Sequence, residues 1–125
     1  MWAADSSRKP VLEKADGFDA KLANVEEQLL EKTIAEGDQK SFRGPLGLYL
    51  KFVWLGAEIG TGGADVSGNS DFPPTQAEYE VFHLLDGELK EAQNQFAGLT
   101  QSDLTVLNQE LAKAGMQSIS VPAQQ

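Results

Sequence analysis

His83 is the only histidine in the chain, so it is the first side chain to consider for catalysis. Glu80 and Asp86 lie three residues to either side, and a helix would place all three on one face. A base flanked by acids could carry protons, but this pattern includes no nucleophile and no oxyanion donors. The same spacing is ordinary charge patterning on an exposed helix, which is the interpretation we favour. A weaker alternative is a hydrolase subunit that uses Glu58, Asp65 or His83.

The stretch from Gly60 to Pro74 is rich in glycine, serine, asparagine and proline, which predicts an irregular loop. Its glycines lack the Gly-Lys-Ser/Thr ending of a phosphate loop and the spacing of a dinucleotide fingerprint. Residues 65–71 place oxygen ligands at alternate positions, faintly like a calcium loop. However, Gly68 stands fourth rather than sixth, and position twelve is Gln76 rather than Glu. Turn chemistry explains these side chains without a metal. We therefore predict no catalytic, cofactor-binding or metal-binding residue.

A more promising group is aromatic. Tyr49, Phe52 and Trp54 fall within one apolar run, where they could form core, an interface or a ligand pocket. Such a stripe is more often core, and core is the interpretation we favour. A small domain has difficulty covering every side of an apolar helix, however, and exposed apolar patches mark interfaces. If the group forms a surface, we expect Asp65 and Phe72 from the following loop to extend it.

Four helices are expected to position these residues. The first spans about residues 7–36, and its apolar residues are spaced as a heptad seam. The second, about 46–59, is apolar on nearly every side, so we expect neighbouring protein to surround it. The third, about 76–97, begins at a Thr75/Glu78 capping box and carries another seam. The seams consist of Val11, Ala15, Phe18, Leu22, Val25 and Leu29, and of Phe82, Leu85, Leu89, Ala92 and Phe96.

Gly98 is expected to end the third helix, with Thr100 and Asp103 capping a short fourth one. Gly115 should end that helix, leaving residues 116–125 as a tail. The seams predict antiparallel pairing of the first and third helices, with Leu22 and Leu89 buried. We therefore predict a single all-α domain, ordered over about residues 7–115. Its architecture would be a long antiparallel helical hairpin with a buried short helix and a short C-terminal helix, similar to a four-helix bundle.

Composition narrows the possible partners. The chain has 125 residues and a net charge of −9, from 19 acidic and 10 basic side chains. Nucleic-acid backbones and anionic membrane surfaces repel such a chain, so we expect neither as a partner. The absence of cysteine excludes disulfides and cysteine-based zinc sites. The chain opens almost directly on a helical pattern, which suits a piece of a larger protein.

A family resemblance runs through four segments, namely Gly44–Leu55, Glu58–Val66, Phe72–Thr75 and Ser102–Asn108. In order and character they resemble the C-terminal helical region of bacterial proteins built on sortilin-like, Asp-box β-propellers, which are often labelled glycosyl hydrolases. Asp-box motifs and propeller strands are absent from this chain, so the resemblance carries over no catalytic residue. It implies an extracytoplasmic setting and a packing role beside a propeller.

These observations lead us to expect a non-catalytic accessory domain. It would pack against the propeller of a larger protein, or against a second copy of itself, and use no cofactor. The alternative is a small-ligand or carbohydrate-binding helper domain. In that case Tyr49, Trp54 and the loop from Gly60 to Pro74 would form the pocket.

Overall fold

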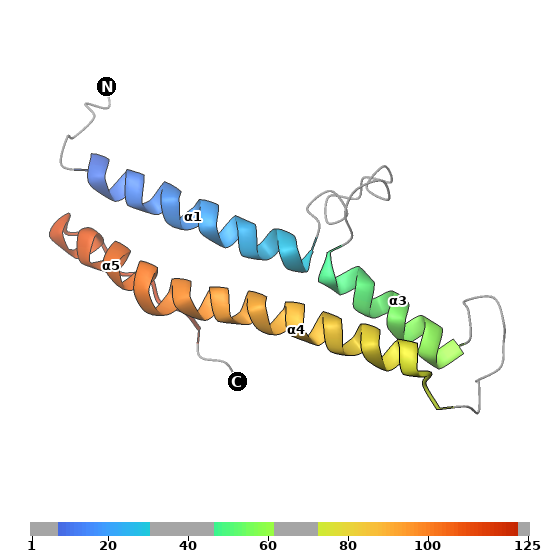
Figure 1. Ribbon diagram of the computed structural model, residues 1–125. Helices are drawn as coiled ribbons and strands as arrows, with labels where there is room; N and C mark the ends of the chain where they lie inside the picture. The colour runs from blue at the N-terminus through green and yellow to red at the C-terminus, as the bar shows by residue number, and fades with distance from the viewer. Residues whose placement is uncertain (1–7, 31–46, 62–72, 123–125) are drawn as a thin grey trace, which may run out of the picture. The chain divides into compact units, whose positions relative to one another are not determined.

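The computed structural model describes residues 8–30, 47–61 and 73–122, and every regular element in these ranges is helical. The helices are α1 (Lys9–Leu29), α3 (Leu48–Thr61), α4 (Gln76–Gly98), the π-helical segment η2 (Leu99–Asp103) and α5 (Leu104–Lys113), as Figure 1 shows. The prediction of an all-α fold is confirmed. No helix in the described ranges has the length and apolarity needed to cross a membrane. The loop from Gly60 to Pro74 lies largely outside them.

Contacts divide the chain into two compact units. One consists of Met1–Val25 with Asn94–Gln125, and the other is Glu26–Gln93, so the division falls within α1 and within α4. The core of the first unit is a cluster of Val11 from α1 with three leucines of α5. The leucines are Leu104, Leu107 and Leu111. Ala15, Phe18 and Ala114 pack around this cluster.

Helix α1 packs as its heptad seam predicts. Val11 and Val25 are buried, and the four seam residues between and after them are half-buried. Lys21 pairs with Asp103, whereas Val11 lies among the leucines further along α5, so α1 runs antiparallel to η2 and α5 within this unit (Figure 1). Leu22 and Leu89, which we expected to be buried, are half-buried.

The prediction that Gly98 ends a helix is wrong. Gly98 has φ −60° and ψ −43°, and Asp103 is also helical with no side-chain cap, so α4, η2 and α5 form one continuous helix. The Leu104 N–H donates to the Leu99 carbonyl, five residues back, which makes this a π turn. That wider turn keeps Leu99 and Leu104 on the same side, and both are buried. The change of phase resembles a helix break in the sequence.

Hydroxyl groups line the π turn. Thr100 donates to the Ala97 carbonyl at 3.0 Å, Ser102 to the Gly98 carbonyl at 2.7 Å and Thr105 to the Gln101 carbonyl at 2.8 Å. Such hydroxyls compete for backbone acceptors, which favours local departures from α-helical bonding. Thr100 therefore bonds within the helix rather than capping a new one.

Two helix ends agree with the sequence. At the start of α4, the Thr75 N–H donates to Glu78 Oε2 at 2.5 Å, and the Glu78 N–H donates to Thr75 Oγ1 at 3.2 Å. This is the predicted capping box. At the end of α5, Gly115 adopts φ +70°, and the Met116 N–H donates to the Leu111 carbonyl at 2.8 Å. Only glycine takes that backbone conformation readily, so α5 ends there.

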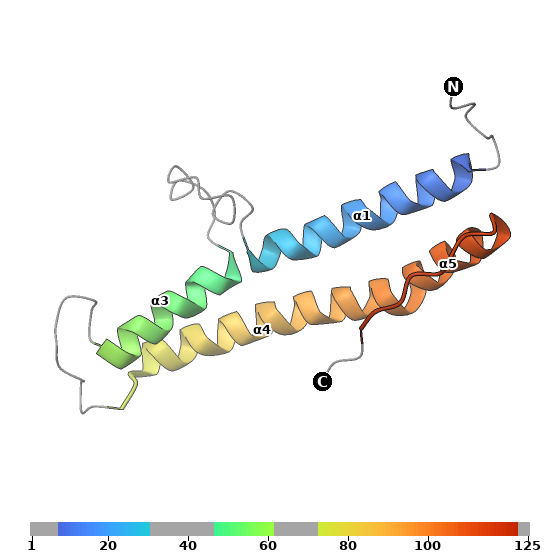
Figure 2. The same cartoon turned by 180° about the vertical axis from the view of Figure 1, so that it is seen from behind.

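In the second unit, α3 lies beside the beginning of α4 (Figures 1 and 2). Leu48 of α3 and Leu85 of α4 are buried. Lys51 Nζ lies 3.1 Å from Glu88 Oε2 and links the two helices. This packing fixes which side of α3 faces away from α4.

Candidate functional site

Helix α3 has two apolar sides with different surroundings. Leu48, Phe52, Leu55 and Ile59 are spaced four, three and four residues apart, so they share one side of the helix. Leu48 is buried, Phe52 and Leu55 are half-buried, and Ile59 is at the margin of exposure. This side is the packed one.

The other apolar side is open to solvent. We call it the outward face of α3; it comprises Tyr49, Val53, Trp54, Gly56 and Gly60. The three large side chains are 61%, 46% and 57% exposed, respectively. A Cβ added at either glycine would meet nothing within 4 Å. The outward face therefore contains two exposed aromatic rings and no charged residue.

The interpretation of the aromatic stripe as core is wrong for Tyr49 and Trp54, which are exposed. Phe52 differs because it belongs to the packed side. One neighbouring helix surface can cover only one side of α3, and α3 is apolar on more than one side. Asp65 and Phe72, the remaining candidates for this surface, lie outside the described residues.

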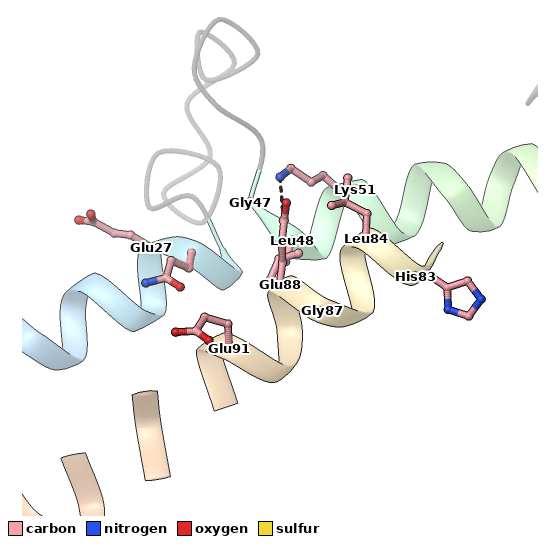
Figure 3. Close-up of a pocket in the computed structure, with 10 residues that line it drawn as sticks. Glu27, Gly47, Leu48, Lys51, His83, Leu84, Gly87, Glu88 and Glu91 are labelled. Atoms are coloured by element: carbon pink, nitrogen blue, oxygen red, sulfur yellow. Dashed lines mark hydrogen bonds and ion pairs between the residues drawn. The ribbon is translucent and has the colours of Figure 1, made fainter. Parts of the chain in front are cut away.

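A hollow of about 640 Å³ adjoins the first turn of α3, but the outward face does not line it. Figure 3 shows Lys51 beside Glu88, with Leu48 and Leu84 next to them and Glu27 and Glu91 nearby. Three carboxylates surround one ammonium group in this hollow. A pocket made from Tyr49 and Trp54 is therefore not what this hollow provides.

The acidic partners proposed for His83 have other neighbours. Asp86 Oδ2 lies 2.7 Å from Lys90 Nζ, and Glu80 Oε1 accepts from Gln76 Nε2 at 3.2 Å. The imidazole is exposed, and its ring lies 5.6 Å from that of Phe82. In Figure 3 it points away from Lys51 and Glu88. Glu58 is exposed on α3, and Asp65 falls outside the described residues.

The Lys21–Asp103 ion pair was not expected from the sequence. Lys21 Nζ donates to Asp103 Oδ2, and Ser102 Oγ donates to Oδ1 of the same carboxylate at 3.1 Å. The Lys21 hydrogen bond, followed by that of Ser102, lowers the pKa of Asp103 below its usual value. Hollows of about 390 and 400 Å³ adjoin the pair. The two residues are 82 positions apart, so sequence spacing gives no signal for their pairing.

No group of three potential metal-binding side chains occurs in the described ranges, where histidine, cysteine, aspartate and glutamate were considered. Comparisons with protein-family models, with curated proteins and with solved structures each find no match to this chain. The case for function therefore depends on the surfaces described above.

Proposed function

We propose that this chain is a non-catalytic helical interaction module that docks onto a larger protein through the outward face of α3. The observation that carries the proposal is the exposure of Tyr49, Val53 and Trp54 on one uncharged helix side. Tyrosine and tryptophan supply a large share of binding energy at interfaces, because they bury much apolar area with few rotatable bonds. A packed helix also holds them in place before binding.

The partner we propose is a larger protein rather than a second copy. Each copy carries a net charge of −9, so self-association would bring like charges together. The segments that resemble helical regions of sortilin-like proteins support a β-propeller as that partner, in an extracytoplasmic setting. Two of these segments, Gly44–Leu55 and Glu58–Val66, include most of α3. The partner and the setting thus belong to the proposal.

The alternative of a small-ligand or carbohydrate-binding helper stays a prediction. It needs Tyr49 and Trp54 to line a concavity. The hollow beside α3 is lined by Leu48 and Lys51 from that helix instead, and it is acidic.

Native complex size tests the proposed function. The full chain, tagged and produced in its native host, should elute from a sizing column in a complex larger than itself. Tyr49→Ser combined with Trp54→Gln should return it to the elution volume of the free chain, since both exposed rings are lost. Leu12→Ser is the matched control, because Leu12 is 61% exposed on α1, as Tyr49 is on α3.

Circular dichroism should show equal helix content in all three proteins. The proposal fails if the wild-type chain elutes free, or if the double variant stays in the complex. It also fails if the complex consists of copies of this chain alone, because a dimer would then occupy the surface.

A further inference from the structure

The segment that follows α5 is held to it by one asparagine. Asn108 Nδ2 donates to the Ile119 carbonyl at 2.9 Å, and the Ile119 N–H donates to Asn108 Oδ1 at 2.8 Å. The side-chain amide thus pairs with both backbone groups of one residue, as a residue of a neighbouring β-strand does. Figure 2 shows the segment returning along α5.

The segment must be nearly extended to make this contact. From Asn108 to Gly115 the helix advances roughly 10 Å, at about 1.5 Å per residue. Only the residues from Met116 to Ile119 return over that length, so each must span about 2.6 Å, which approaches the rise of a β-strand. We call residues 116–122 the extended segment.

One edge of the extended segment is unpaired. In an extended chain the backbone groups of adjacent residues point to opposite sides. Because those of Ile119 face Asn108, those of Ser118 and Ser120 face away from α5. Neither serine forms a hydrogen bond with any other described residue. Such an edge is a template for strand pairing.

The side chains fit a half-buried strand. Ile119 and Val121 are 50% and 47% exposed, and they alternate with Ser118 and Ser120. This alternation places apolar groups on one face and hydroxyl groups on the other. No charged residue occurs in the extended segment. It therefore combines a free backbone edge with an uncovered apolar face.

We propose that the extended segment is a docking strand that pairs with the exposed edge strand of a partner protein's β-sheet. The described residues of this chain include no strand that could cover it. A second copy offers only the same short segment, and an isolated two-stranded pair is marginally stable in water. It would also bring together two chains of charge −9. A sheet edge instead presents a strand that is already formed.

This surface lies in the other unit from the outward face of α3, so the inference goes beyond the proposed function. The free protein supplies a first test by amide hydrogen exchange. The Ile119 amide should exchange more slowly than those of Ser118 and Ser120, and Asn108→Ala should remove the difference. Slow exchange at both serines in the purified chain would mean that the edge is already covered, and would overturn the proposal.

Photo-crosslinking identifies what pairs with the segment. A photoreactive residue in place of Val121, in the full chain produced in its native host, should crosslink to an edge strand of another protein. Ser120→Pro should reduce the yield about tenfold, because proline removes the outward N–H. Ser120→Ala retains that N–H and should stay within about twofold of the parent yield.

The proposal is overturned by crosslinks to a helix or loop, to this chain itself or to a second copy. No crosslink at all, or equal losses in the proline and alanine variants, would also overturn it. Circular dichroism should remain unchanged in both variants, because position 120 lies outside the helices.

Discussion

Helices α3 and α5 show that apolar content and burial are different properties. α3 is 14 residues long and almost entirely apolar, yet Leu48 is its only buried residue among positions 48–60. α5 is 10 residues long and more polar, yet three of its leucines are buried. Periodicity explains the difference. The leucines of α5 share one side that faces α1, whereas the apolar residues of α3 surround the helix and exceed what one neighbour can cover.

The excess in α3 is therefore the more informative feature for function. An ordinary amphipathic helix such as α5 has its apolar side covered within the chain. α3 keeps a second apolar side in water, where it contributes nothing to folding and lowers solubility. Binding to another surface gives that second side a physical role.

Substitutions in the two helices should differ most in stability. Leu107→Ala should lower the free energy of unfolding by about 2–5 kcal/mol, since Leu107 is 3% exposed within the leucine cluster. Trp54→Gln should change it by no more than about 0.5 kcal/mol, because the ring is mostly in water. Urea denaturation followed by circular dichroism measures both values.

Val106→Ala is the control within α5, because Val106 is exposed beside Leu107. It should behave like Trp54→Gln. A large loss for Trp54→Gln, or a negligible one for Leu107→Ala, would remove the distinction between the helices.

Local signals in the sequence were sufficient for the helices and for two of their ends. The Thr75/Glu78 pair and Gly115 act through their immediate neighbours, so residue type and spacing identify them. Gly98 could not be read this way. Its helical conformation depends on the π turn, and that turn depends on how Leu99 and Leu104 pack in the fold. Local sequence has no means of reporting such packing.

The candidate surface was only partly predictable for a similar reason. Sequence identified Tyr49, Phe52 and Trp54 as one group because they lie close together in an apolar run. It could not divide them, since the division depends on which side of α3 meets α4. Phe52 falls on the packed side and the other two on the outward face. Long-range contacts such as Lys21–Asp103 were beyond reach altogether.

Two glycines test whether α5 continues α4, as the comparison with α3 assumes. Gly115→Ala should destabilise the chain by about 1–2 kcal/mol, because alanine is strained at φ +70°. Gly98→Ala should stabilise it by up to about 1 kcal/mol, since Gly98 is helical and an added Cβ meets nothing within 4 Å. Thermal unfolding at fixed pH gives the order of the variants. If Gly98→Ala is the more destabilising change, a helix break occurs there after all.

The smallest effect concerns the ion pair at the start of α5. The pKa of Asp103 lies below its usual value of 3.8, chiefly because Lys21 donates a hydrogen bond to the carboxylate. The unfolded chain lacks that bond, so protons bind the unfolded state more tightly. The stabilisation is therefore present above the unfolded pKa and is lost as pH falls through the folded one. Because Asp103 is exposed to solvent, the change in stability should be small. Titration of the Asp103 carboxyl carbon by NMR should give a higher pKa in Lys21→Met than in the wild type. Lys51→Met, which breaks the ion pair between α3 and α4, is the control and should leave the Asp103 titration unchanged. If Lys21→Met also leaves it unchanged, Lys21 does not hold this carboxylate in solution, and only packing joins α1 to this part of the long helix.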